Sequence, residues 1–325
     1  MVYFRHKSYK FFIKYKDASV KKGNALKRKY RSDFYGYRHP VIYVQGAMVV
    51  VLGLLAIFII LCQGELKKRA ACSWICEDIN EQEDYRAGKV NETLLSYMID
   101  TAGEEQPLWE LVTDMYFYEQ VYHQEFHGTR DQQKKIGFLK KEFQKEYESL
   151  LQSNAMIWKD IQYFPVAWSE NCDSSWVTYG DSWRFERSYG GKRTHEGCDI
   201  MAERNERGFY PVVSITDGVV EKKGWLEKGG YRLGIRSPQG AYFYYAHLFS
   251  YADIEVGEEV RAGELIGFMG DSGYGEEGTT GKFPVHLHIG IYLPAKHNRE
   301  QSVNPYPVMR YLENRKIQMD YGKKF

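Results

Sequence analysis

The stretch Val285-His-Leu-His-Ile-Gly-Ile-Tyr-Leu293 sets two histidines into an apolar run. Successive side chains of a β-strand point to opposite faces, so His286 and His288 share one face and the leucine and isoleucines between them share the other. Two imidazoles on an otherwise apolar strand are costly as packing residues, because buried polar groups need partners. The pattern therefore predicts a half-buried strand with a chemically active polar face.

Further strand-like segments precede this one, separated by Gly-containing turns. They cover residues 210–215, 218–220, 231–235, 241–247 and 265–268. Short strands at this spacing indicate an antiparallel β domain. We expect a mainly β catalytic domain over residues 161–325.

The N-terminal part contains a long uncharged stretch, residues 40–64, with the 14-residue apolar run 48–61 at its centre. A helix needs about 20 predominantly apolar residues to cross a bilayer core, so we predict a transmembrane helix over residues 40–63. A buried core helix is disfavoured by the basic flank. A cleaved signal peptide is the main alternative, weakened by the 40-residue leader and the lack of a small-residue cleavage site.

Charge is concentrated before this stretch. Residues 1–40 hold twelve Lys or Arg against two Asp, although the whole chain has a net charge of only +1. Basic residues flank cytoplasmic ends of membrane helices, which predicts a basic cytoplasmic tail over residues 1–39 and a single-pass protein with the remainder extracytoplasmic. Attraction to anionic lipid explains the tail beside a span, so we expect no nucleic-acid partner.

Residues 64–160 are expected to form an extracytoplasmic connector and a helical stalk or subdomain, because apolar and aromatic residues recur there at spacings of three and four. His123 and His127 are four apart in this region. A metal between them is disfavoured, because no third ligand completes the set.

Four cysteines would lie outside the membrane, where disulfides are permitted: Cys72, Cys76, Cys172 and Cys198. Three full pairings are open, and Cys172 with Cys198 is one candidate pair.

A second motif, His195-Glu-Gly-Cys-Asp199, adds a histidine and a carboxylate. Catalytic zinc takes three N or O protein ligands and keeps a fourth position open. His195, Asp199 and one of the two strand histidines, His286 or His288, would supply that set. The other strand histidine suits acid–base work, and His247 adds a further imidazole.

Together these residues resemble the lysostaphin/LytM-type zinc endopeptidases. The resemblance covers roughly residues 180–310 and includes these motifs: His195-x3-Asp199-Ile200, Tyr210-Pro-Val-Val, Asp217-Gly-Val-Val220, Tyr245-Ala-His-Leu248, Val260-Arg-Ala-Gly-Glu-Leu-Ile-Gly267, His286-Leu-His288 and Asn304-Pro305.

The resemblance implies an antiparallel LytM-type β fold with Zn²⁺ bound by His195, Asp199 and His288, and with His247 and His286 as catalytic histidines. It also implies an enzyme of the bacterial cell membrane that hydrolyses peptide bonds in peptidoglycan stem peptides or cross-bridges. Residues 65–160 would then be free to bind a protein partner.

Two other interpretations stay open. Some LytM-type domains are scaffolds or regulators of division or sporulation that bind wall or a partner without cutting. A glycosidase would need a pair of carboxylates, for which Glu186 and Glu196 are the candidates, but it leaves the histidines unexplained.

Overall fold

The computed structural model describes residues 38–76, 79–101, 106–170, 172, 175–188, 192–297 and 300–320. The chain divides into two compact units, Met1–Leu66 and Lys67–Phe325. All but the last residues of the predicted basic tail lie outside the described residues.

Helix α2 (Arg38–Cys76) contains the predicted apolar segment. Within its part Tyr43–Ser73, the most apolar window has a mean hydropathy of 2.8, and none of it is buried. Among the described residues this is the one helix long and apolar enough to cross a membrane, by length and composition; a signal sequence meets the same test. The helix continues past residue 63 because the sequence there, Glu65-Leu-Lys-Lys-Arg-Ala-Ala71, consists of strong helix formers.

The predicted helical region is confirmed. It contains η1 (Ile79–Glu81), α3 (Glu83–Arg86), α4 (Glu92–Thr101), α5 (Leu108–Tyr122), α6 (Arg130–Glu142) and α7 (Gln144–Trp158). His123 ends α5 with a φ of 52°, so His127 lies beyond that helix and the two histidines share no helix face.

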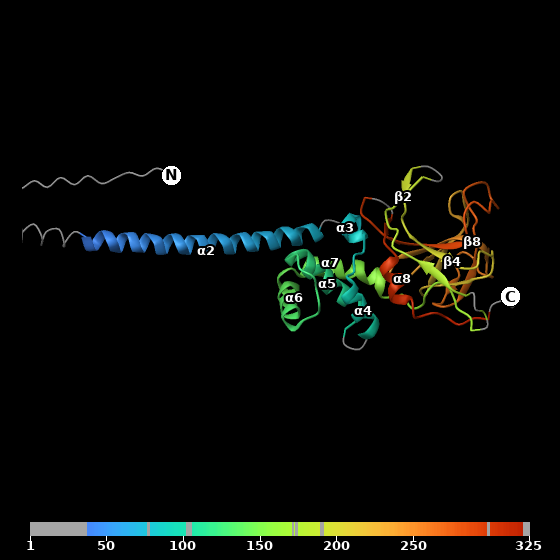
Figure 1. Cartoon of the computed structure of the whole chain (residues 1–325), viewed down its shortest axis with the longest axis horizontal. Helices are drawn as coiled ribbons and strands as arrows, with labels where there is room; N and C mark the ends of the chain where they lie inside the picture. Colours follow the sequence, from blue (N-terminus) through green and yellow to red (C-terminus); the bar gives the residue numbers. More distant parts are fainter. Residues whose placement is uncertain are drawn as a thin grey trace, which may run out of the picture. The chain divides into compact units, whose positions relative to one another are not determined.

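The C-terminal part is the expected mainly antiparallel β domain. Its strands are β1 (Val177–Tyr179), β2 (Glu186–Arg187), β3 (Arg193–Thr194), β4 (Cys198–Ala202), β5 (Pro211–Val213), β6 (Gly218–Leu226), β7 (Gly230–Arg236), β8 (Tyr242–Tyr251), β9 (Glu259–Val260), β10 (Leu265–Met269), β11 (His286–Leu293) and β12 (Gln301–Val303). The path β1-β4-β11-β8-β7-β6-β9 runs through a 10-stranded sheet, and β2 and β3 form a separate hairpin. Figure 1 shows β4 and β8 within this domain.

Strand β11 lies between β4 and β8, at the centre of the sheet. Leu287, Ile289 and Ile291 are fully buried, whereas His286 and His288 face a groove on the opposite side. The two-residue alternation predicted for this strand is therefore confirmed. A core of apolar side chains holds one face of the strand, so the histidine positions are rigid.

The sequence patterns did not predict β1 to β4, β9, β12 or the C-terminal helix α8 (Tyr306–Leu312). Helix α8 lies beside the end of α7 in Figure 1, where the rings of Trp158 and Tyr311 are 6.3 Å apart. All of these strands except β4 have only two or three residues, which carry too little periodicity to be recognised.

Helical and β regions belong to the same compact unit. Arg86 donates from Nε to the backbone oxygen of Ser302 at 2.7 Å and from Nη2 to its Oγ at 3.0 Å. Asn304 donates to the backbone oxygen of Ala87 at 3.0 Å. These contacts tie helix α3 to the end of the β domain. The boundary between residues 160 and 161 stays a prediction.

The candidate disulfide between Cys172 and Cys198 is wrong, because both are free thiols. Cys198 is 1% exposed, its Sγ lies 3.8 Å from the backbone oxygen of Gly180, and burial raises the pKa of its thiol to about 12. It therefore behaves as a small core residue.

Candidate metal centre and groove

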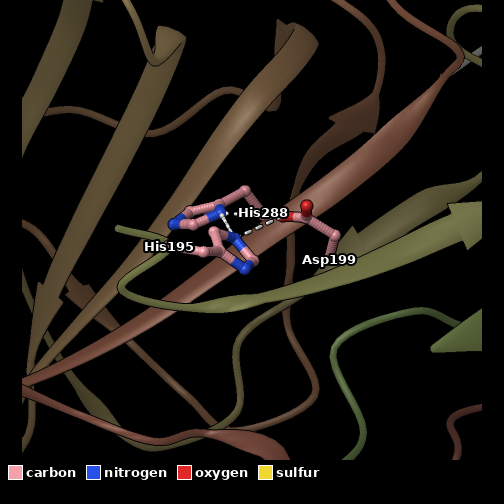
Figure 2. Close-up of side chains that lie close together, drawn as sticks. All are labelled: His195, Asp199 and His288. Atoms are coloured by element: carbon pink, nitrogen blue, oxygen red, sulfur yellow. Dashed lines mark hydrogen bonds and ion pairs between the residues drawn. The ribbon is translucent and has the colours of Figure 1, made fainter. Parts of the chain in front are cut away.

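Three side chains converge at one point of the β domain, as Figure 2 shows. His195 Nε2 lies 3.0 Å from Asp199 Oδ1, His288 Nδ1 lies 2.8 Å from the same oxygen, and the two nitrogens are 3.1 Å apart. They form a group of N and O atoms that can hold a metal ion. The fold therefore brings together His195 and His288, which are 93 positions apart and belong to two different sequence motifs.

Strand pairing creates this convergence. Asp199 of β4 is the direct cross-strand partner of His288 in β11, and His195 lies in the turn just before β4. Gly197 occupies the space between them. A Cβ there would lie 2.3 Å from His288 Cε1 and 2.6 Å from the oxygen of Ile289, so the close approach requires glycine.

The donor set fits a zinc ion. Zinc at about 2.0–2.1 Å from each ligand in a tetrahedron requires ligand atoms about 3.3 Å apart. The observed separations of 2.8–3.1 Å are close to this value. Two imidazoles and one carboxylate are also the ligand types that zinc prefers, and three protein ligands leave one position open.

The ring of His195 is oriented by contacts of its Nδ1, the nitrogen that does not face Asp199. Its Nδ1 lies 2.9 Å from Ser182 Oγ and 3.3 Å from the backbone oxygen of Ser182, which directs Nε2 toward Asp199. Burial lowers the pKa of His195, which favours the neutral ring. Such outer contacts fix the ring and tautomer of a metal-binding histidine.

Asp199 is anchored on its other oxygen. Arg187 donates from Nη2 to Asp199 Oδ2 at 2.7 Å, leaving Oδ1 for the two histidines. Burial alone would raise the pKa of Asp199, but hydrogen bonds with His195 and His288 outweigh it and hold that pKa far below the usual range. The carboxylate is thus ionised at neutral pH.

The remaining two predicted histidines stand beside this cluster. The rings of His247 and His286 are 4.7 Å apart, and His286 Nε2 lies 3.9 Å from Asp199 Oδ1. Nδ1 of His286 lies 2.8 Å from the oxygen of Pro284, and Nδ1 of His247 lies 2.7 Å from the oxygen of Ser272. A carbonyl accepts only, so each Nδ1 carries its proton and each Nε2 offers a lone pair.

Both of these rings are buried, which lowers the pKa of His286 and takes the pKa of His247 well below its ordinary value. His247 reaches the groove because its φ of 62° breaks the alternation of β8, whose Tyr242, Tyr244 and Ala246 already face that way. The structure thus brings all five nominated residues into one place.

The cluster lies in a groove of about 860 Å³. Tyr242, Tyr244 and Tyr292 line one part, and the rings of Tyr244 and His288 are 6.0 Å apart. Tyr274 and Phe283 line another part, next to His247. Aromatic walls around a small number of polar groups are typical of a ligand-binding site.

The two carboxylates considered for a glycosidase do not form a catalytic pair. Glu196 accepts from Arg184 at 2.8 Å and from Ser302 at 3.0 Å, while Glu186 lies on β2 and does not line the groove. The carboxylate of Glu196 is therefore used structurally.

The sequence analysis did not identify the groove residues Arg187, Arg232 and Tyr274, nor Ser182, which contacts His195. No spacing or motif marks them, because each reaches the site from a different loop or strand.

Comparisons with known proteins agree with this geometry. Residues 193–305 match the profile of peptidase family M23. The chain is 46% identical over 148 residues to the L-Ala–D-Glu endopeptidase of Bacillus subtilis, covering 45% of this chain and 43% of the relative. It is 38% identical over 118 residues to the DD-carboxypeptidase/endopeptidase Mpg of Neisseria meningitidis, covering 36% of this chain and 23% of that protein. The matches thus span less than half the length of these curated relatives.

A solved structure from Ruminococcus gnavus, assigned as a glycyl-glycine endopeptidase LytM, is similar over a longer range. It matches with a TM-score of 0.70 and 48% identity, covering 78% of this chain and 99% of the other. Because nearly the whole of that protein is matched at this identity, the chain belongs to peptidase family M23.

Proposed function

We propose that this protein is a zinc-dependent endopeptidase that hydrolyses peptide bonds in peptidoglycan. The proposal is carried by the converging atoms of His195, Asp199 and His288 beside two further imidazoles in one groove. Its relatives include proteins named as endopeptidases, and peptidases of family M23 are metallopeptidases.

In this proposal His195 Nε2, Asp199 Oδ1 and His288 Nδ1 hold the zinc ion. Zinc supplies Lewis acidity, which polarises a peptide carbonyl and makes water easier to deprotonate. Ser182 and Arg187 keep the ligands in place through the contacts at 2.9 and 2.7 Å.

In this proposal His286 and His247 accept and donate protons during hydrolysis. Each has Nδ1–H bonded to a backbone carbonyl, so Nε2 can accept a proton from the attacking water. Once protonated, the same nitrogen can donate to the oxyanion that develops on the cleaved carbonyl or to the leaving amine. We assign one of the two rings as general base and the other as oxyanion stabiliser.

The substrate in this proposal is a stem peptide or cross-bridge of the bacterial wall. The Bacillus subtilis relative is named for an L-Ala–D-Glu bond and the Ruminococcus gnavus protein for a glycyl-glycine bond. An open groove of about 860 Å³ admits an extended peptide of either kind.

Helix α2 serves as a single membrane anchor in this proposal, with residues 1–39 in the cytoplasm and the peptidase unit outside. The length and apolar character of the helix support it. The helical region 65–160 then stands between membrane and wall, where it can bind a protein partner.

The test is digestion of purified peptidoglycan by the full chain in detergent, with products identified by mass spectrometry. We expect new amino termini at one peptide bond, in a reaction that stops on chelation and resumes with zinc. Release of sugar reducing ends instead, or unchanged hydrolysis by His286→Ala, would contradict the proposal. Binding of wall without any cleavage would favour a scaffold.

A further inference from the structure

The groove has an excess of positive charge. Six basic residues line it: Arg187, Arg193, Lys222, Lys228, Arg232 and Lys282. Three carboxylates line it as well, and all are already engaged. Glu196 pairs with Arg184 at 2.8 Å, Glu300 pairs with Arg236 at 2.6 Å, and Asp199 belongs to the histidine cluster.

Four of the six basic residues have no ion pair within the described part of the chain: Arg193, Lys228, Arg232 and Lys282. Like charges gathered in a cleft repel one another and raise the local concentration of anions. The groove is therefore electrostatically matched to a ligand with negative charge.

Arg232 is the most informative of these residues. It lies on β7 at an irregularity in the β7–β8 register. Burial raises the pKa of Tyr242 and of Tyr244, and the positive charge of Arg232 opposes that rise in both. Tyr244 in turn contacts the ring of His288. Nη1 of Arg232 is buried and has no hydrogen-bond partner among the residues that the structure describes. The nearby Glu221 and Glu300 are both engaged by Arg236 at 2.6 Å.

A second pair of arginines lines the groove from the β2–β3 hairpin. Arg187 and Arg193 are direct cross-strand partners, and like charges in that position destabilise a hairpin. Nε of each arginine is buried, and no described residue forms a hydrogen bond with it. Arg187 Nη2 is occupied by Asp199, and Arg193 Nη2 donates to the hydroxyl of Tyr274.

Three arginines of one groove thus each hold a buried N–H for which the described residues supply no acceptor. A buried unsatisfied donor is costly, and a charged one more so. Guanidinium and carboxylate form strong paired hydrogen bonds, so a carboxylate is the ligand group to which arginines lining a groove are best suited. A neutral oligoglycine segment brings no such charge.

We infer that the groove selects acidic peptides, with Arg232 as a specificity-determining contact for a free carboxylate close to the cleaved bond. This inference rests on the proposed endopeptidase function and names its substrate class. Among bonds of the kinds named for the relatives, it favours one next to a glutamyl residue over a glycyl-glycine bond.

The experiment compares three synthetic peptides with the full chain in detergent: one with an L-Ala–D-Glu bond and a free glutamyl carboxylate, its twin in which that carboxylate is an amide, and a neutral oligoglycine. We expect kcat/KM to be about 10- to 100-fold higher for the acid than for the amide, since a hydrogen bond to a charged group has about this effect. Arg232→Gln should lower kcat/KM for the acid more than for the amide.

Arg261→Gln is the matched control, because Arg261 is an exposed arginine outside the groove. It should keep the full acid preference. The affinity of the same peptides for the protein, measured by calorimetry after a chelator has removed zinc, gives an independent readout. The acid should bind more tightly than its amide.

Equal cleavage of acid and amide by the wild type would overturn the inference, as would an equal loss on both peptides in Arg232→Gln. If no peptide is cut, the proposed function fails. The binding measurement then still decides the inference: a preference for the acid supports a carboxylate subsite, and equal binding refutes it.

Discussion

Two buried aspartates of the same compact unit, Asp114 and Asp199, differ in the groups that surround their carboxylates. Asp114, in helix α5, is 7% exposed and surrounded by donors. Tyr147 donates to Oδ1 at 2.8 Å, Lys140 lies 2.7 Å from the same atom, and Gln106 donates to Oδ2 at 2.9 Å. Both oxygens of the buried carboxylate therefore have partners, and all of these partners belong to the helical region.

Asp199 of the β domain is also largely buried, but two of its neighbours are imidazole nitrogens that face each other at 3.1 Å. His195 Nε2 and His288 Nδ1 also lie 3.0 and 2.8 Å from the same oxygen of Asp199, so three atoms that can bind a metal ion share one point. A buried carboxylate that is surrounded by donors stabilises a fold, whereas a buried carboxylate grouped with two imidazoles can hold a cation.

Asp199→Asn should have the largest effect of the substitutions considered. Removing a ligand should eliminate zinc binding and lower kcat/KM by about 1,000-fold or more, because Lewis acid catalysis supplies several kcal/mol. Zinc content measured by mass spectrometry and peptide hydrolysis check it. Asp114→Asn should keep its zinc, and loss of zinc in both variants would remove the distinction.

The converse change is Asp114→Ala. It leaves the hydroxyl of Tyr147 and the ammonium of Lys140 without their buried acceptor, and should lower the free energy of unfolding by about 3 kcal/mol. Denaturant unfolding measures this. Activity per zinc-loaded molecule at low temperature should stay at the wild-type level.

Removal of zinc should destabilise the wild type but not a variant that lacks a zinc ligand. A ligand present at 100 times its Kd stabilises the folded state by about 2.7 kcal/mol, so chelation should lower the Tm of the wild type. The Tm of Asp199→Asn should not respond to zinc or to the chelator. Differential scanning calorimetry with and without zinc tests both statements.

Gly197→Ala should have an intermediate effect. The new methyl group would collide with the ring of His288, which must turn away from Asp199. We expect zinc affinity to fall about tenfold, the effect of a disturbed outer contact. Gly180→Ala is the control, because nothing lies within 4 Å of a Cβ at that position. Equal affinities in the two variants would argue against a rigid ligand geometry.

The smallest effect is expected at Glu83, whose side chain is half exposed and lies 2.5 Å from Arg184. That hydrogen bond lowers the pKa of Glu83 below its ordinary 4.5. Its stabilising contribution is therefore present above about pH 4.5 and lost as pH falls through the folded-state pKa. Glu83→Gln should change the free energy of unfolding by less than about 1 kcal/mol at pH 7. A Tm difference from the wild type that shrinks in acid would support this assignment.

Much of the site was predictable because it follows from short-range regularities. The alternation along β11 placed His286 and His288 on one face, and the structure confirms it. The short β2–β3 hairpin was missed, since a strand of two residues has no measurable period. Helix α8 was missed because its seven residues form only about two turns. Arg187 and Arg232 were missed for a different reason: single basic residues have no signature until a fold places them in a cleft.

By itself the sequence determined which side chains were available and which face of a strand carried them, because periodicity is a local property of the backbone. The spacing of the motifs left open whether His286 or His288 meets Asp199, and the folded chain brings His288 Nδ1 to 2.8 Å and His286 Nε2 to 3.9 Å from its Oδ1. The folded chain also points Nδ1 of His247 and of His286 at a carbonyl, and it leaves three arginines with a buried N–H that no described residue accepts. These features depend on the register between strands about 90 residues apart, and register is set by the packing of the whole core.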